Sequence, residues 1–131
     1  MHSSLYDHGM QEALKHKWIE SQKMGADLGS AAMADWYYRY WRQYCRIRLL
    51  EHVSGARPWA EFEDGRFGLI AKLLRENDLL LDRILDRVRF GAENLDIICW
   101  AREWGLNMDR VITLLEKLDI NRARIDPNWP S

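Results

Sequence analysis

The stretch WYYRYWRQYCR, residues 36–46, contains six aromatic residues and three arginines in eleven positions. Helical side chains repeat about every 3.6 residues, and on that period most of the rings share one broad face. The apolar face carries Met33, Tyr37, Tyr40, Trp41, Tyr44 and Ile47, and the opposite side carries Arg39, Arg42 and Arg46. We therefore predict an amphipathic helix whose rings face a core and whose arginines face solvent, with Trp36 and Tyr38 at its margins.

Both ends of this helix can be read from the sequence. Ser30 can serve as its N-cap, and Gly55 can end it ahead of a proline. Its last turns are apolar on nearly every side, with Leu49, Leu50 and Val53. We expect the helix to run from Ser30 to about Val53 and its far end to be central to the core.

Helical patterns continue through the rest of the chain. Only three prolines occur, at positions 58, 127 and 130, and period-2 alternation is nowhere sustained. Further helices are predicted at 5–24, 69–90, 93–104 and 108–118, with a connector at 59–68. The third helix either continues through or breaks at Asn77-Asp78, and in the first helix Met10, Leu14 and Trp18 share one face.

The sequence therefore predicts an all-α fold. We expect a compact bundle of about five helices, with a helix-turn-helix-like hairpin near the C-terminus. A chain of 131 residues favours a single domain over 1–131, with an irregular tail from about 119 to 131.

Composition narrows the class of protein. The formal net charge of −1 argues against a free-standing nucleic-acid binder of high affinity. Two cysteines, Cys45 and Cys99, are too few for a disulfide framework and favour a reducing compartment. The N-terminus lacks the apolar run of a signal peptide, and no segment is long and apolar enough to span a membrane. We expect a cytoplasmic protein without a cofactor.

The arginines of the aromatic helix are the first candidate surface. Residues 35–58 contain five arginines and two acidic residues, a local charge of +3. Arg39, Arg42 and Arg46, with Arg48 and Arg57 near the far end, could contact RNA, DNA or an acidic protein face. The alternative is a core helix with a solvated charged back.

The segment IICWAREWGLNMDRVITLLEKL, residues 97–118, is the second candidate. Ala101 is small where two helices would cross, and Gly105 suits a turn that needs a positive φ. The segment resembles a helix-turn-helix, and its second half resembles the helix after the turn in MerR-type regulators. That resemblance implies that Asn107, Met108, Asp109, Arg110, Thr113 and Lys117 face the major groove.

The charge of this region argues against that reading. Residues 92–120 contain six acidic and three basic residues, a net charge of −3, and phosphates would repel Asp109. A hairpin with a purely structural role is the alternative, because any tight helical hairpin favours a small crossing residue and a glycine turn.

The sequence gives little support for a catalytic site or a metal site. His8, Glu12 and His16 repeat every four residues, but the two histidines are about 12 Å apart along a helix, too far for one ion. His8–Glu12 or Glu12–His16 could form half of a site, and a solvated polar face is the alternative. Cys45 and His52 are two turns apart, and Cys99 resembles a small core residue. Known catalytic motifs are missing.

We therefore expect a non-catalytic helical interaction module, a small subunit or adaptor that docks on a protein partner through the aromatic–arginine helix. Nucleic-acid binding, through Arg39, Arg42 and Arg46 or through the 97–118 hairpin, is the alternative. A small metal-dependent or other enzyme is the third hypothesis. A second copy of the chain also stays open as a partner.

Overall fold

The computed structural model describes residues 2–127, and over this range the chain is all-α, as predicted. Its α-helices are α1 (Leu5–Met24), α2 (Ser30–Ser54), α3 (Ala71–Arg75), α4 (Leu79–Arg89), α5 (Asn94–Glu103) and α6 (Met108–Leu118). Two short 3-10 helices are η1 (Asp64–Arg66) and η2 (Ile120–Ala123). Among the described helices, none has the length and apolar character that crossing a bilayer requires.

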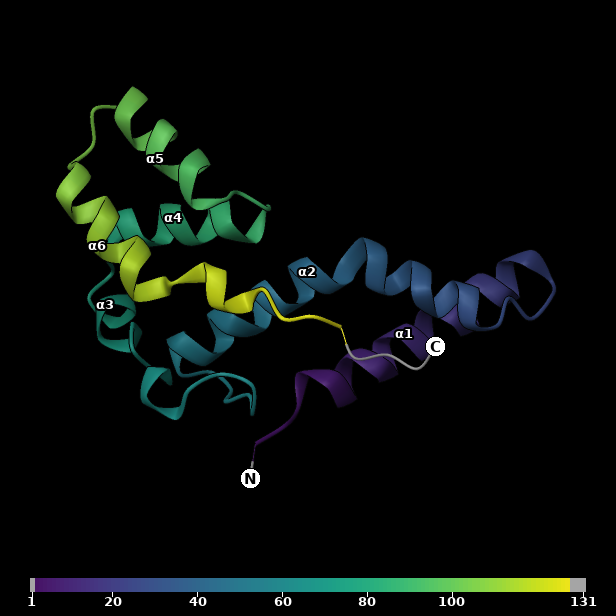
Figure 1. The fold of residues 1–131 in the computed structure, drawn as a ribbon. Helices are drawn as coiled ribbons and strands as arrows, with labels where there is room; N and C mark the ends of the chain where they lie inside the picture. Colours follow the sequence, from purple (N-terminus) through teal and green to yellow (C-terminus); the bar gives the residue numbers. More distant parts are fainter. Residues whose placement is uncertain (1, 128–131) are drawn as a thin grey trace.

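The two longest helices form an arm (Figure 1). α1 and α2 run side by side, joined by a short turn in which Gly25 and Gly29 both have positive φ. The second half of α2 leaves this arm and packs against α3, α4 and η2. The molecule is therefore less compact than the bundle that we predicted, although one continuous core cluster extends from Leu5 to Ala123. The single-domain organisation stays a prediction.

α2 confirms most of its sequence pattern. Tyr37 and Trp41 are buried, and Leu49, Leu50 and Val53 are buried at its far end, which is central to the core as expected. Three rings differ from the prediction. Tyr40, which was expected to face the core, is about half exposed. Of the two rings expected at the margins, Trp36 is buried and Tyr38 is almost fully exposed.

α1 packs on α2 with a face made of Leu5, Gly9 and Ala13, all buried. The helices approach closely there because Gly9 is small enough to admit the Trp41 ring. The face that carries Leu14 and Trp18 points away, and both side chains are exposed.

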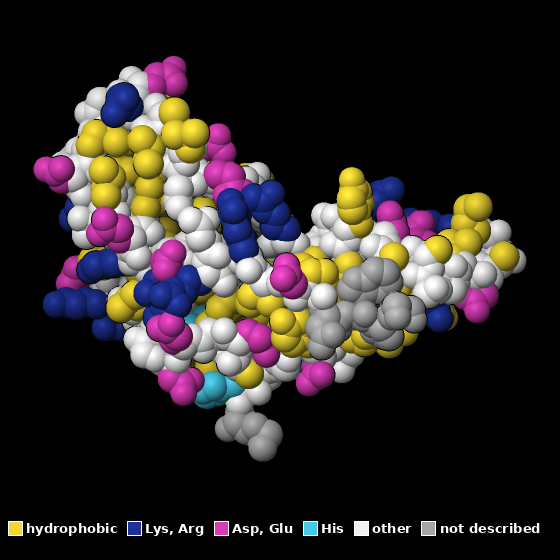
Figure 2. Space-filling model, viewed as in Figure 1, with side chains coloured by type: hydrophobic (Ala, Val, Ile, Leu, Met, Phe, Trp, Pro, Cys, Tyr) yellow, Lys and Arg dark blue, Asp and Glu magenta, His cyan; other side chains and the backbone are white. Residues whose placement is uncertain are grey.

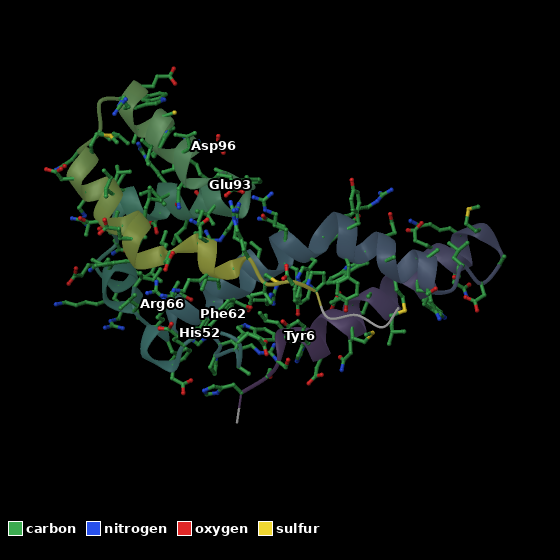
Figure 3. All side chains as sticks on the ribbon, in the orientation of Figure 1. Tyr6, His52, Phe62, Arg66, Glu93 and Asp96 are labelled. Atoms are coloured by element: carbon green, nitrogen blue, oxygen red, sulfur yellow. The ribbon has the colours of Figure 1, made fainter. Side chains whose placement is uncertain are left out.

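The connector after α2 is tied to the end of that helix. Trp59 and Phe62 are buried, and the ring of His52 is fully buried between them and the backbone. His52 Nδ1 accepts the Trp59 backbone N–H at 3.1 Å, and Nε2 donates to the Glu63 carbonyl at 2.8 Å. These two bonds require the neutral imidazole with its proton on Nε2. Figure 3 shows His52 and Phe62 together beneath α2.

The predicted helix at 69–90 is two helices, which changes the predicted count from five to six within residues 2–127. Asn77 has a φ of 55°, a left-handed conformation that ends α3. Asp78 then caps α4, since its carboxylate accepts the Leu81 backbone N–H at 3.1 Å.

The predicted irregular tail is partly ordered. η2 buries Ile120 and Ala123, and Ile125 accepts a 2.6 Å hydrogen bond from Trp41 Nε1. Residues 128–131 of the predicted tail lie outside the described range. The tail packs because its two apolar residues complete the core beside α2.

Candidate interaction surface

Glu93, the residue before α5, is the centre of a basic cluster. Arg42, Arg46 and Arg124 all pair with this one carboxylate. Arg46 donates to Glu93 at 2.8 Å and to the Ala92 carbonyl at 3.1 Å, while Arg124 lies at 3.5 Å. Three positive charges against one negative charge leave this part of the surface basic.

The burial of Arg46 corrects the sequence prediction. Its side chain was expected to face solvent with Arg39 and Arg42, but the residue is only 4% exposed. The Ala92 carbonyl and Glu93, both contributed by the loop before α5, cover its guanidinium. Arg46 therefore holds that loop on α2 and is not available to a partner.

The cluster also sets the charge state of Glu93. Partial burial alone would raise the pKa of this carboxyl group. The hydrogen bond from Arg46 and the charges of Arg46, Arg42 and Arg124 outweigh burial, so the pKa of Glu93 is lower than its ordinary value. Glu93 is therefore ionised at neutral pH.

Arg39 and Tyr38 lie on the exposed side of α2. Arg39 Nε donates to Asp35 at 2.8 Å, one turn earlier, and Asp35 also bonds His16 Nε2 at 3.0 Å. The His16 bond, followed by the charge and hydrogen bond of Arg39, lowers the pKa of Asp35. Tyr38 is 92% exposed and is one turn from Arg42 on the same row.

Arg48 and Arg57 lie apart from that row. The Arg48 guanidinium lies 5.0 Å from the Tyr44 ring centre and pairs with Glu51 at 3.0 Å. The Arg57 guanidinium lies 4.4 Å from the Trp59 ring centre and bonds Ser3 and His8. Both side chains are half-buried, so the structure does not bring the five predicted contact arginines together on one surface.

Two hollows border the Glu93 cluster. One, of about 510 Å³, is lined by Arg83, Asp86, Arg87, Phe90, Gly91 and Ala92. The other, of about 280 Å³, is lined by Trp41, Arg42, Ala123, Arg124, Ile125 and Asp126. Figure 2 shows the concave region between the arm and the α4–α6 part, with basic side chains gathered at its base. Figure 3 places Glu93 and Asp96 at the start of α5, beside that region.

Phe90 is the second ring exposed near this cluster. It follows α4, is 91% exposed and is three residues before Glu93. The carbonyls of Val88 and Arg89 just before it accept hydrogen bonds from Gln43 of α2. We define the basic–aromatic surface as Tyr38, Arg39, Arg42, Phe90 and Arg124.

Three of the six predicted groove-facing residues of the 97–118 segment, Asn107, Arg110 and Thr113, bond other groups of the chain. α5 and α6 pack on each other across Gly105, which has a φ of 64°. Asn107 caps α6 by accepting the Arg110 backbone N–H at 3.2 Å, and the Arg110 guanidinium bonds Asp78. The hydroxyl of Thr113 bonds the Asp109 carbonyl at 2.8 Å.

The remaining three positions differ in exposure. Met108 is half-buried against the core, whereas Asp109 and Lys117 are exposed. DNA contact by this segment stays a prediction that no finding tests.

The candidate metal ligands of α1 have separate partners. His8 bonds Arg57, His16 bonds Asp35, and Glu12 pairs with Lys15 at 3.5 Å. Residues 2–127 contain no group of three His, Cys, Asp or Glu side chains placed to hold a metal ion.

The two cysteines occupy different environments. Cys45 is fully buried in α2, and burial raises the pKa of its thiol to about 12. Cys99 is exposed on α5, which corrects the prediction that it is a core residue. Ile97 and Ala101 supply the buried face of α5 instead.

Sequence reasoning missed Glu93, Arg124 and Phe90 as parts of this surface. All three lie far outside the aromatic stretch at 36–46, and Glu93 is 47 residues from Arg46. No local sequence pattern therefore links them to the arginines of α2. Comparison with protein-family models, with curated proteins and with solved structures finds no match for this chain.

Proposed function

We propose that this protein is a non-catalytic interaction module that docks on an acidic protein partner through the basic–aromatic surface. The observation that carries the proposal is the sharing of one carboxylate, Glu93, by Arg42, Arg46 and Arg124. Of these, Arg42 and Arg124 keep exposed guanidiniums that an acidic partner can reach.

The exposed rings support the same proposal. Tyr38 and Phe90 are each more than 90% exposed. In a monomer their apolar surface contributes no burial energy, whereas a partner that covers them would gain it. Tyrosine and arginine are enriched at the energetic centres of protein interfaces. Rings beside arginines therefore combine an apolar contact with charge complementarity, which also steers association.

Overall charge favours a protein partner over a nucleic acid. The chain carries a formal net charge of −1, and Asp35 and Asp126 lie beside the surface arginines. A free-standing nucleic-acid binder needs a larger basic excess. A cytoplasmic location belongs to the same proposal, since Cys45 and Cys99 are both free thiols.

The test begins with the partner that co-purifies from the native cell after nuclease treatment. Once identified and purified, its affinity is measured by calorimetry for the wild type and for the triple variant Arg39→Gln, Arg42→Gln, Arg124→Gln. We expect at least a tenfold loss of affinity for the triple variant, with a further loss on Tyr38→Ala. Wild-type affinity should fall as salt rises, because exposed charges are screened.

The matched control removes three exposed charges elsewhere, Arg75→Gln, Arg102→Gln and Lys117→Gln. It has the same net charge as the surface variant. Equal losses of affinity in both variants would show that only net charge matters, and would refute docking through the basic–aromatic surface. Arg46 is left unchanged in both variants because its guanidinium is buried against Ala92 and Glu93. Material that is lost on nuclease treatment would instead support the nucleic-acid alternative.

A further inference from the structure

α1 has two apolar faces, and within residues 2–127 only one of them is buried against another helix. Leu5, Gly9 and Ala13 are buried against α2. The second face, about 140° around the helix, carries Met10, Leu14 and Trp18 at intervals of four residues. Met10 is half-buried, Leu14 is 45% exposed and Trp18 is 64% exposed, so the stripe is most open at Leu14 and Trp18.

A hollow continues the stripe toward the turn. It measures about 510 Å³ and is lined by Lys17, Trp18, Ser21, Gln22, Gly25, Ala26 and Asp27. Trp18, Ser21, Gln22 and Gly25 follow one another at helical spacing, so they share the face of the stripe. The outer face of α1 therefore presents the half-buried Met10, the exposed Leu14 and Trp18, and then a hollow with a polar wall.

We propose that this face pairs with the same face of a second copy of the chain. The two α1 helices would run antiparallel about a twofold axis at Leu14. This proposal is independent of the proposed docking function, because the basic–aromatic surface lies on α2, α4 and the segment after α6.

The stripe is self-complementary in this arrangement. Met10 and Trp18 are each four residues from Leu14, so an antiparallel copy places Met10 on the second copy's Trp18. Leu14 meets Leu14 on the axis, as an isologous interface requires. A thioether against a ring is a favourable contact, and the dimer would contain two of them.

Charge complementarity selects the same register. Asp7, in the first turn of α1, is exposed and is seven residues from Leu14. The axis therefore places it against Ser21 of the second copy, inside the hollow. Lys17, Ser21 and Gln22 line that hollow and can donate hydrogen bonds to a carboxylate.

The oligomeric state tests the proposal. One helix face buries less area than a standard protein interface of about 1,600 Å², so we expect an association that depends on concentration. Sedimentation of the purified chain should show a mass that rises toward twice the monomer mass up to millimolar concentration. A mass that stays monomeric throughout this range overturns the proposal.

Two tryptophans of similar exposure provide the matched variants. Trp18 is 64% exposed on the stripe, and Trp104 is 69% exposed at the end of α5. We expect Trp18→Glu to give a monomer and Trp104→Glu to leave the dimer intact. Circular dichroism should show both variants folded. A dimer that survives Trp18→Glu, or that Trp104→Glu dissociates instead, refutes this interface.

Cross-linking tests the register. In a Cys99→Ser background, Leu14→Cys places a thiol on the twofold axis, and a short bifunctional maleimide should give a covalent dimer. Ile112→Cys is the control, because Ile112 is similarly exposed but lies on α6. Equal dimer yields from both variants would reject the axis at Leu14.

Discussion

Gly9 of α1 lies directly against the indole of Trp41 in α2. A β-carbon at position 9 would be only 2.5 Å from Cζ3 of Trp41. The same indole stacks on Tyr6 at 5.9 Å and donates its N–H to the Ile125 carbonyl at 2.6 Å. Trp41 therefore joins both helices of the arm to the segment after α6, and Gly9 provides the space that it needs.

This contact predicts an inverted effect for Gly9→Ala. Replacing a glycine within a helix by alanine ordinarily stabilises by about 0.5–1 kcal/mol. Here the added methyl group overpacks the core, and we expect a loss of about 1–3 kcal/mol in urea unfolding. Gly65→Ala is the control, since nothing lies within 4 Å of its added carbon. Stabilisation by Gly9→Ala would show that the helices separate easily at this point.

Removing the charge of Glu93 should destabilise the fold strongly. Arg46 is nearly fully buried beside it, and a buried charge that loses its partner costs about 3–5 kcal/mol. We expect a loss in that range for Glu93→Gln, measured by urea unfolding at neutral pH. Arg42→Gln, which removes an exposed partner of the same carboxylate, should cost at most about 1 kcal/mol. Similar losses for the two variants would contradict the burial of Arg46.

The lowered pKa of Glu93 predicts a loss of stability in acid. The folded pKa lies below that of the unfolded chain, about 4.3 for a glutamate. The stabilisation is therefore complete above the unfolded pKa and is lost as the pH falls through the folded pKa. Urea midpoints measured from pH 7 downward should fall more steeply in this window for the wild type than for Glu93→Gln. If the midpoints of the two proteins fell in parallel with pH, ionisation of Glu93 would not contribute to the acid sensitivity.

His52 is predicted to have a structural role, which is to hold the connector after α2 in place. His52→Leu removes the acceptor for the Trp59 N–H and the donor for the Glu63 carbonyl. An unsatisfied buried group costs about 1–3 kcal/mol, so we expect a loss of about 2 kcal/mol or more. His2→Leu, at an exposed histidine, should change the stability by less than about 0.5 kcal/mol. An unperturbed His52→Leu variant would show that the connector has other anchors.

The cysteines should differ in reactivity. Burial and a pKa of about 12 protect the Cys45 thiol, whereas Cys99 is exposed. A thiol reagent at neutral pH should label one cysteine in the native protein and two after unfolding. Cys99→Ser should abolish the native labelling. Rapid labelling of the Cys99→Ser variant would mean that α2 opens at Cys45.

Local signals were sufficient to predict most helix ends. The bounds of α1 and α6 agree with the prediction, because glycine and asparagine at their ends control hydrogen bonds within one turn. The break at Asn77-Asp78 was recognised as an option but not decided. A left-handed asparagine and an aspartate cap are individually compatible with a continuous helix pattern.

The sequence alone determined the helical class, the amphipathic character of α2 and the apolar end of that helix. Those properties depend on the spacing of residues within a few turns, which the chain carries locally. Only the tertiary structure decided which apolar face of α1 packs inward and whether an arginine of α2 is exposed. The first depends on Gly9 meeting Trp41, and the second on Arg46 meeting Glu93, 47 residues away. Such contacts are set by the fit between distant surfaces, so no periodicity within either helix contains them.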